Sequence, residues 1–390
     1  MKPTENELFE KQKQNVQHLS KDYLDDRDQT KNLKQFDPYK FVFYQEQVME
    51  LLNTGSLRSP ITLDIDPTNI CNQNCTWCSF DYLHRRKDSL SKDALSKLIA
   101  DIAEFKKANG CGVRSIIFTG GGEPTLNPHL EDLMIQCSLA DIKFGLYTNG
   151  TNITESLSNT MLESGSFVRF SLEASTKFLY DSLHKPNDAE AFKKVTNTIQ
   201  YLVKKKNEHH SNLTIGISFL VHPENYLDIV DSVKRAKEEL GVDYFQVKPV
   251  IKKAYEKQDL NNRIVEHIKN KYEEVCSYSD KDFDVIVVEQ KLDDIVDRNY
   301  GRTYPECLGH YFSSTITADG NVYICTEHRG IEKYRIGNLN EQGFYDIWNS
   351  EKRKSVIDSI DLNECQPGCK GHFRTLIVEH IKKIKHVDFI

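Results

Sequence analysis

Between residues 61 and 290, short apolar runs alternate with longer amphipathic segments, and this rhythm constrains the fold more than any other feature of the chain. The runs predict seven strands, and the segments between them have helical spacing. Strands separated by helices form parallel βαβ units, whose site is built by loops at the carboxyl ends of the strands. We therefore expect an α/β fold with an incomplete barrel. The predicted strands cover residues 61–65, 115–119, 143–147, 167–172, 213–221, 244–247 and 283–288.

The segments on either side of the barrel have a different character. Residues 1–60 are mostly polar and charge-mixed, and predict a helical extension without chemistry. Residues 314–324 alternate around Asp319-Gly320, which is a strong hairpin signal. A helix near 343–358 follows. The sequence thus predicts three parts: an extension over 1–60, a barrel over 61–300 and a small α+β domain over 301–390.

Composition excludes several classes of protein. The 390 residues are 38% hydrophobic and 28% charged, which is enough to bury a core. The net charge of −7 argues against a duplex nucleic-acid partner bound through phosphates. No run approaches the ~18 apolar residues of a membrane helix, and the polar N-terminus has no signal-peptide core. We expect a cytoplasmic protein with no membrane partner, in which ten cysteines indicate metal or redox chemistry.

Three of these cysteines crowd into one predicted loop. Cys71, Cys75 and Cys78 form a C-x3-C-x2-C pattern directly after the first strand. Three thiolates so close together suit a [4Fe–4S] cluster, because its fourth iron then stays open for another ligand. A zinc site with one distant ligand is an alternative, although zinc usually shows paired C-x2-C units. A loop with surplus thiols is the third interpretation.

Four further cysteines lie in the last quarter of the chain. They are Cys307, Cys325, Cys365 and Cys369, and they fall in a segment with little apolar core of its own. Such small domains often need a metal as a staple. The other three, Cys111, Cys137 and Cys276, are scattered, and we expect them to be structural thiols with no place at the site.

The first cysteine loop, with an aromatic residue at Trp77, resembles the signature of the radical SAM superfamily. The resemblance extends over about 65–310. Thr119-Gly-Gly-Gly-Glu-Pro124 at the end of the second strand resembles the family's GGE motif. Thr148-Asn-Gly150 ends the third strand and Ser171-Leu-Glu173 the fourth. This resemblance implies a partial (β/α)6-type radical SAM barrel that cleaves S-adenosylmethionine reductively and removes a hydrogen atom from a C–H bond.

The resemblance also implies roles for single residues. The three cysteines would hold the cluster, the glycines would admit the methionyl part of S-adenosylmethionine, and the carboxylate would bind its ammonium group. Trp77 would contact adenine, and the polar residues that end the third and fourth strands would contact ribose. The implied cofactor-binding residues are Trp77, Gly120, Gly121, Gly122, Glu123, Asn149, Ser171 and Glu173.

The C-terminal cysteines, with Gly320 and Cys325 in the hairpin, resemble the SPASM/twitch extension that follows some radical SAM cores. A full SPASM domain carries more cysteines and two clusters. The four cysteines here therefore imply the shorter twitch form with one auxiliary [4Fe–4S] cluster that is fully ligated by protein. Such a cluster would transfer electrons or serve only structure. A structural zinc ion and unliganded thiols are the alternatives.

The sequence leaves the substrate open. Lys248 follows the sixth strand and His222 the fifth, and each would act as a catalytic base or bind an anionic substrate. We expect hydrogen abstraction from a polar small molecule (a sugar, aminocyclitol or nucleotide-sugar) by an oxidoreductase, with isomerase and lyase outcomes open. The alternative is a maturase that modifies a ribosomal peptide or protein side chain. A flavodoxin or ferredoxin would supply the electron.

Overall fold

A computed structural model describes residues 38–78, 87–251, 260–288, 291–292, 302–366 and 368–385. Phe41–Ile390 form one compact unit, and Met1–Lys40 form another. The predicted extension over 1–60 therefore lies mostly outside the described residues, and the domain boundaries at 60 and 300 stay predictions. Among the described residues, no helix is long and apolar enough to cross a membrane.

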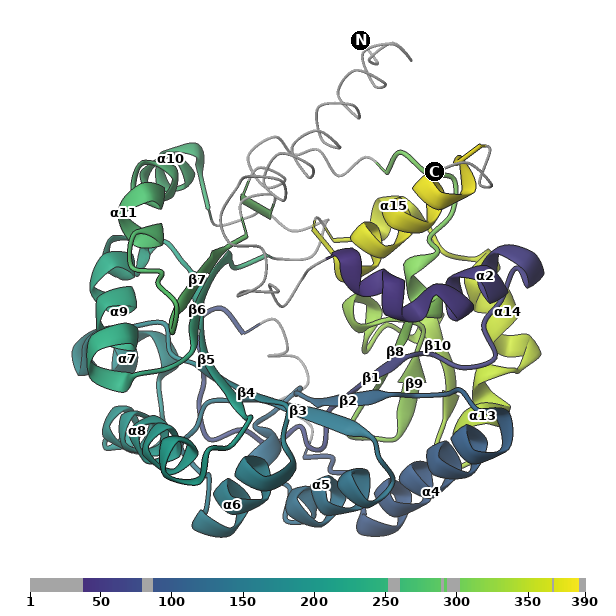
Figure 1. Ribbon diagram of the computed structural model, residues 1–390, viewed down its shortest axis with the longest axis horizontal. Helices are drawn as coiled ribbons and strands as arrows, with labels where there is room; N and C mark the ends of the chain where they lie inside the picture. The colour runs from purple at the N-terminus through teal and green to yellow at the C-terminus, as the bar shows by residue number, and fades with distance from the viewer. Residues whose placement is uncertain are drawn as a thin grey trace. The chain divides into compact units, whose positions relative to one another are not determined.

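One sheet of ten strands organises the larger unit, in the order β10-β9-β8-β1-β2-β3-β4-β5-β6-β7 (Figure 1). Strands β1 to β7 are parallel and adjacent in chain order. This is the predicted partial barrel, with a seventh parallel strand at its edge. The strands are β1 (Thr62–Ile65), β2 (Ser115–Phe118), β3 (Lys143–Thr148), β4 (Phe167–Ser171), β5 (Thr214–Val221), β6 (Tyr244–Pro249), β7 (Asp284–Val287), β8 (Ser313–Ile316), β9 (Asn321–Tyr323) and β10 (Arg335–Asn338).

Helices cover the outer side of this curved sheet (Figure 1). Local signals set several of their ends. The Ser91 hydroxyl accepts from the Ala94 amide at 3.2 Å where α4 begins, and Gly110 ends α4 in the left-handed conformation. The helices are α2 (Gln45–Thr54), α4 (Lys92–Asn109), α5 (Leu130–Leu139), α6 (Glu155–Ser164), α7 (Lys177–His184), α8 (Ala191–His209), α9 (Ile229–Arg235), α10 (Asn262–Asn270), α11 (Tyr272–Cys276), α13 (Phe344–Trp348), α14 (Glu351–Asp358) and α15 (Lys370–Lys382).

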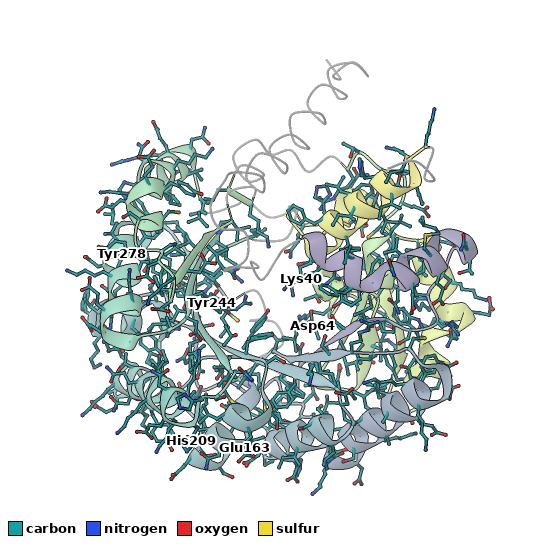
Figure 2. The ribbon with its side chains drawn as sticks, in the orientation of Figure 1. Lys40, Asp64, Glu163, His209, Tyr244 and Tyr278 are labelled. Atoms are coloured by element: carbon teal, nitrogen blue, oxygen red, sulfur yellow. The ribbon has the colours of Figure 1, made fainter. Side chains whose placement is uncertain are left out.

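The two faces of the sheet differ in chemistry because side chains alternate along each strand. The outward face is apolar and packs under the helices, as Leu63, Phe118 and Phe170 do. The inward face is polar, and includes Asp64 on β1 and Tyr244 on β6, which point away from the outer helices that carry Glu163 and His209 (Figure 2). The apolar face therefore supplies the core, while the polar face lines the space where chemistry can occur.

The C-terminal segment continues the barrel sheet. Strand β8 pairs in parallel with β1, and β9 and β10 follow as antiparallel neighbours. The predicted hairpin is confirmed, with Gly320 at φ +82° in its turn. The indole Nε1 of Trp348 donates to the Leu57 carbonyl at 2.8 Å. We expected an appended domain, whereas these strands extend the sheet itself.

Candidate functional site

Cys71, Cys75 and Cys78 lie in the loop that follows β1, at the carboxyl end of the barrel strands. Backbone hydrogen bonds hold this loop against the end of α7. The amides of Asn74 and Thr76 donate to the carbonyls of the last two residues of α7, each at 3.0 Å. The loop is thus placed by a helix more than a hundred residues further along the chain.

The chemistry of these three thiols fits an iron–sulfur cluster. Burial, with smaller contributions from the nearby Glu123 carboxylate and from Cys78, raises the pKa of the Cys71 thiol to about 12. Burial likewise raises the pKa of Cys75 well above its usual value. Such thiols become thiolates when a positive charge stands beside them, and iron supplies that charge. Three thiols in one loop leave one iron of a cubane without a protein ligand.

The glycine loop after β2 packs directly on the cysteine loop. A β-carbon on Gly122 would lie 2.2 Å from the carbonyl oxygen of Ile70, and one on Gly120 would lie 2.2 Å from the carbonyl oxygen of Gly122. The Gly122 amide also donates to the Thr68 carbonyl at 3.0 Å. Gly122 therefore lets the two loops approach each other, and Gly120 allows the tight turn within its own loop. Their predicted approach to the methionyl group stays a prediction.

Glu123 is buried and accepts hydrogen bonds at both carboxylate oxygens. Its Oε1 accepts from the Thr125 amide at 3.1 Å and from the Thr125 and Thr148 hydroxyls at 2.8 and 2.6 Å. Its Oε2 accepts from the Asn149 amide at 2.7 Å. Burial raises the pKa of Glu123, and these hydrogen bonds oppose that shift. A carboxylate has about four acceptor positions, so Oε2 retains room for the predicted ammonium contact.

Asn149 links two loops at the carboxyl edge. Its Nδ2 donates to Asn72 Oδ1 in the cysteine loop at 2.8 Å, and its Oδ1 accepts from the Thr151 amide and hydroxyl at 3.0 and 2.8 Å. These contacts commit the side chain to the protein itself. Ser171 is half-buried at the end of β4, where it pairs in register with Ser218. The ribose roles of Asn149 and Ser171 stay predictions.

Glu173 lies against a histidine that the sequence did not single out. The Glu173 Oε2 is 3.0 Å from the Nε2 of His184, and both side chains are about 1% exposed. The angle between them does not make a hydrogen bond. The Glu173 carboxylate is buried, and neither of its oxygens has a hydrogen-bond partner among the described residues. Its predicted ribose contact stays a prediction.

His184 connects that carboxylate to the cysteine loop. Its Nδ1 lies 3.5 Å from the Cys75 sulfur and 3.1 Å from Gln73 Oε1. The ring stacks on Tyr180, with centroids 4.1 Å apart, and meets Trp77 edge-on at 5.3 Å. His184 ends α7, a helix of eight residues that periodicity alone did not indicate. The Thr176 hydroxyl, which accepts from the Leu179 amide at 3.3 Å, was the local signal for it.

A cavity of about 200 Å³ lies beside Trp77. Lys248, from the end of β6, lines it, whereas His222 does not. His222 instead packs on Trp77 with centroids 5.6 Å apart, and its Nδ1 accepts from the Glu224 amide at 3.3 Å. Trp77 and Lys248 therefore line the same cavity, whereas His222 contacts Trp77 without lining it. The cavity is lined by Trp77, Leu220, Lys248, Pro249, Val250, Ile251, Lys291, Glu327, Gln366 and Gly368.

The four C-terminal cysteines converge on a second cavity. Cys307, Cys325, Cys365 and Cys369 all line it, together with the buried His310 and His328. Burial raises the pKa of Cys365 to about 12 and that of Cys369 to about 11, and the neighbouring cysteines contribute to each shift. Four thiols around one cavity, with Cys365 and Cys369 buried and the other two half-buried, fit a cluster that is ligated entirely by protein.

These donors are spread around their cavities. Among the residues that the structure describes, no group of three or more His, Cys, Asp or Glu side chains could hold a single metal ion. None of the ten cysteines, all of which are described, forms a disulfide bond. Cys137 is buried in α5, Cys276 ends α11, and Cys111 lies 3.6 Å from Arg58 Nη2. None of these three lines either of the two cavities described here.

A buried ion pair joins the two cysteine regions. Both carboxylate oxygens of Asp66, between β1 and Cys71, accept from Arg329 Nη1 at 2.6 and 2.8 Å. Arg329 follows Cys325 and is 3% exposed, while Asp66 is fully buried. The Thr326 hydroxyl also donates to Asp64, on the inward face of β1. Neither partner has a sequence motif that marks it.

Comparison with family models and known proteins agrees with this geometry. The model of the radical SAM superfamily matches residues 65–236. The model of SPASM, an iron–sulfur cluster-binding domain, matches residues 307–370 and so contains all four C-terminal cysteines. The two matches cover the two cysteine regions in the order in which the chain presents them.

Known relatives cover most of the chain at low identity. A tungsten-containing aldehyde ferredoxin oxidoreductase cofactor-modifying protein of Pyrococcus furiosus is 24% identical over 79% of this chain and 85% of its own. A cysteine-type anaerobic sulfatase-maturating enzyme of Clostridium novyi is 23% identical over 77% of this chain and 85% of its own. The crystal structure of Streptococcus suis SuiB bound to precursor peptide SuiA has a TM-score of 0.60 at 19% identity, covering 96% of this chain and 85% of that one. This last likeness concerns the fold.

Proposed function

Because the chain consists of a radical SAM domain followed by a SPASM domain, we propose that this radical SAM enzyme modifies a side chain of a peptide or protein. Its cofactors are a [4Fe–4S] cluster with S-adenosylmethionine in the first domain and auxiliary iron–sulfur ligation in the second. When bound, the first cluster supplies the electron that cleaves S-adenosylmethionine to methionine and a radical able to remove hydrogen from a C–H bond.

The relatives support a polypeptide substrate over the polar small molecule that the sequence led us to expect. The Clostridium novyi relative is named for the maturation of a sulfatase, which is a protein. SuiB was solved with a precursor peptide bound. The Pyrococcus furiosus relative is instead named for modifying a cofactor, and is the one of these three whose name favours a small molecule.

The observation that carries the proposal is the cavity beside Trp77. One wall belongs to the loop of the three cysteines, and another comes from Gln366 and Gly368, which lie between Cys365 and Cys369. A side chain held there would lie between the two cysteine regions. Its volume of about 200 Å³ suits one side chain of a longer substrate, because sites for whole small ligands are usually larger, at about 300–1,000 Å³.

We infer a net two-electron oxidation of the substrate: one electron would leave with the abstracted hydrogen atom, and the auxiliary cluster, when bound, would accept the other. Among the described residues that line this cavity, none is Cys or Tyr, the side chains that could return a hydrogen atom to a substrate radical. The protein's own part is to hold the first cluster with Cys71, Cys75 and Cys78 and to enclose the reacting C–H bond. A flavodoxin or ferredoxin would deliver the electron that starts the reaction.

The experiment is anaerobic reconstitution followed by reduction with S-adenosylmethionine present. We expect about eight iron atoms per chain, four for each cluster, and formation of 5′-deoxyadenosine. Extract of the native host is then separated by ultrafiltration into macromolecular and small-molecule fractions. The macromolecular fraction should raise 5′-deoxyadenosine formation above its uncoupled rate, and protease treatment should remove that effect.

Matched variants identify what has failed if this result is not seen. Replacing Cys71, Cys75 and Cys78 by Ala should abolish cleavage, whereas Cys111→Ala should leave it intact. Stimulation by the small-molecule fraction alone would contradict a polypeptide substrate and favour the small-molecule expectation. Zinc in place of iron, with no 5′-deoxyadenosine, would contradict the enzyme itself.

A further inference from the structure

The cavity beside Trp77 carries two lysines from neighbouring strands. Lys248 is the penultimate residue of β6, on the inward face that also presents Tyr244 and Gln246. Lys291 follows β7, whose next residue Val288 donates its amide to the Val247 carbonyl at 3.0 Å. Both ammonium groups therefore come from the carboxyl edge of the sheet, where parallel barrels place their substrates.

No described carboxylate pairs with either ammonium group: neither Lys248 nor Lys291 forms a hydrogen bond or ion pair with a residue that the structure describes. Two other acidic groups of this interior face partners of their own. Asp66 pairs with Arg329, whereas Glu173 lies 3.0 Å from His184 Nε2 without a hydrogen bond, and its charge also acts on Lys248. Glu327 is the one carboxylate among the described lining residues. Among those residues, two lysines therefore outnumber one carboxylate.

That excess is costly in the absence of an anion. Burial lowers the pKa of Lys248 well below its usual value, and the charges of Arg169, Lys291 and Lys370 lower it further. Burial also lowers the pKa of Lys291, which Glu327 partly opposes. Both lysine side chains are half-buried, so like charges held near each other at this cavity favour a bound counter-charge. A bound carboxylate would supply it to both groups at once.

S-adenosylmethionine does not meet this need. Its sulfonium and ammonium groups outnumber its single carboxylate, so it carries a net positive charge at neutral pH. Its methionyl carboxylate is also used at the open iron, as the resemblance implies. The anion that suits two adjacent ammonium groups should therefore belong to the other molecule at this site.

We propose that Lys248 and Lys291 form a carboxylate-binding subsite, and that the polypeptide substrate presents a carboxylate there, next to the residue that is modified. This inference rests on the proposed function and adds the substrate's chemistry to it. The carboxylate comes from an acidic side chain or from the end of the polypeptide. Trp77 of the cysteine loop lines the same cavity as the two lysines. The lysines would therefore hold the substrate by charge and place the reacting C–H bond beside that loop.

The test uses reconstituted holoenzyme without reductant and with S-adenosylmethionine at saturation, so that the cofactor's own site is filled. Three probes are titrated by ligand-observed NMR: N-acetyl-glutamic acid α-amide, N-acetyl-glutamine and the neutral N-acetyl-glutaminamide. We expect at least one of the two acids to bind roughly tenfold or more tightly than the neutral amide. Which acid binds identifies a side-chain or a terminal carboxylate.

Variants assign the preference to the two lysines. Lys248→Gln and Lys291→Gln should each reduce the preference for the acid severalfold, and the double variant should remove it. Lys97→Gln, on the exposed side of α4, should retain it in full. Iron content and thermal unfolding midpoint are measured for each protein, so that a misfolded variant is replaced by Lys248→Met or Lys291→Met.

Three results would overturn the subsite. The acids and the amide could bind equally, or the double variant could keep the preference. The variants could also shift the midpoint potential of the auxiliary cluster while leaving the preference unchanged, which would assign the lysines to that cluster's negative charge. A carboxylate preference without stimulation by the macromolecular fraction would instead refute the proposed function and leave the subsite standing.

Discussion

The two cysteine regions of this chain are built in opposite ways. Cys71, Cys75 and Cys78 lie in one loop, where their neighbours in the sequence are their neighbours in space. Cys307, Cys325, Cys365 and Cys369 instead come together from segments before β8, after β9 and before α15. The first region needs the fold to orient one loop, whereas the second exists only when β8, β9 and α15 are already in place.

This difference has an energetic consequence. A cross-link stabilises a protein in proportion to the logarithm of the loop that it closes. A cluster bound at the first region closes a segment of a few residues, while one at the second closes the whole chain between Cys307 and Cys369. Loss of the second cluster should therefore affect stability, and loss of the first should affect mainly chemistry.

The largest effect should come from breaking the second region. Replacing Cys325 and Cys369 by Ala should lower the free energy of unfolding by at least about 4 kcal/mol, because the long segment is no longer closed. The triple Ala variant of Cys71, Cys75 and Cys78 should lose only about 2 kcal/mol. Anaerobic denaturant unfolding measures both. Equal losses of unfolding free energy would contradict this difference between the two regions. Cys137 is not substituted in either variant.

The ion pair between the regions should have the next largest effect. Arg329→Met leaves the Asp66 carboxylate buried without its partner, and should cost about 3 kcal/mol of unfolding free energy. Adding Asp66→Asn should restore part of the loss. Lys92→Met breaks an exposed pair with Asp132 as a control, and should not change stability measurably. If Arg329→Met matched that control, the two regions would not be joined energetically.

Gly122 tests how closely the first region is packed. Gly122→Ala places a β-carbon against the Ile70 carbonyl, and should cost about 2 kcal/mol and loosen the cysteine loop. At Gly343 the same change meets only flexible side-chain carboxylates, Asp346 at 3.2 Å and Asp101 at 3.3 Å, so Gly343→Ala is the matched control. Thermal unfolding and iron content report the two effects. Full iron retention in a fully stable Gly122→Ala protein would refute the packing argument.

A smaller effect should appear in the midpoint potential of the first cluster and not in that of the second. His184→Phe removes an imidazole that lies 3.5 Å from the Cys75 sulfur, while keeping a ring for Tyr180 and Trp77 to pack on. Hydrogen bonds to cluster sulfurs favour the reduced state. We expect the midpoint potential of the first cluster to fall by about 60 mV, or about 1.4 kcal/mol for one electron. EPR-monitored titration should show no shift of the second cluster.

The smallest effect should be a pH dependence of carboxylate binding. Because burial lowers the pKa values of Lys248 and Lys291, these groups lose their charge at lower pH than exposed lysines. The affinity for an acidic probe should therefore fall as pH rises, at lower pH than binding by exposed lysines would show, and the neutral amide should show no such decline. The charged groups that face Lys248 are Arg169, Lys291, Lys370 and Glu173. A flat profile for the acid would contradict binding by these ammonium groups.

Much of the barrel was predictable from local patterns. Each strand from β1 to β7 was expected within about two residues of its observed ends, because each is a short, mostly apolar run between helical segments. The ends of α4 at Ser91 and Gly110 could also be predicted, because single residues of these types mark where helices begin and end. Short elements were not. Helix α7 and strand β10 have too few residues to show a period, and the helix expected near 343–358 breaks where Ser350 caps α14.

The candidate site divides along the same line. Cys71, Gly122 and Glu123 could be identified because each belongs to a short motif whose residues lie close together in the sequence. His184, Lys291 and Arg329 belong to no motif, since their partners lie tens or hundreds of residues away. The ligand roles predicted for Glu123, Asn149 and Glu173 stay predictions, because the structure shows these side chains against other residues of the protein.

The amino-acid sequence by itself therefore predicted the alternation of strands and helices, the loop of three cysteines and the family resemblance that both imply. Tertiary structure alone decided that the C-terminal strands extend the barrel sheet beside β1, and that four distant thiols share one cavity. It also decided that Lys248 and Lys291 stand together without a described counter-ion. Periodicity and spacing report on neighbours within a few residues, whereas charge and packing act between whatever the fold brings into contact.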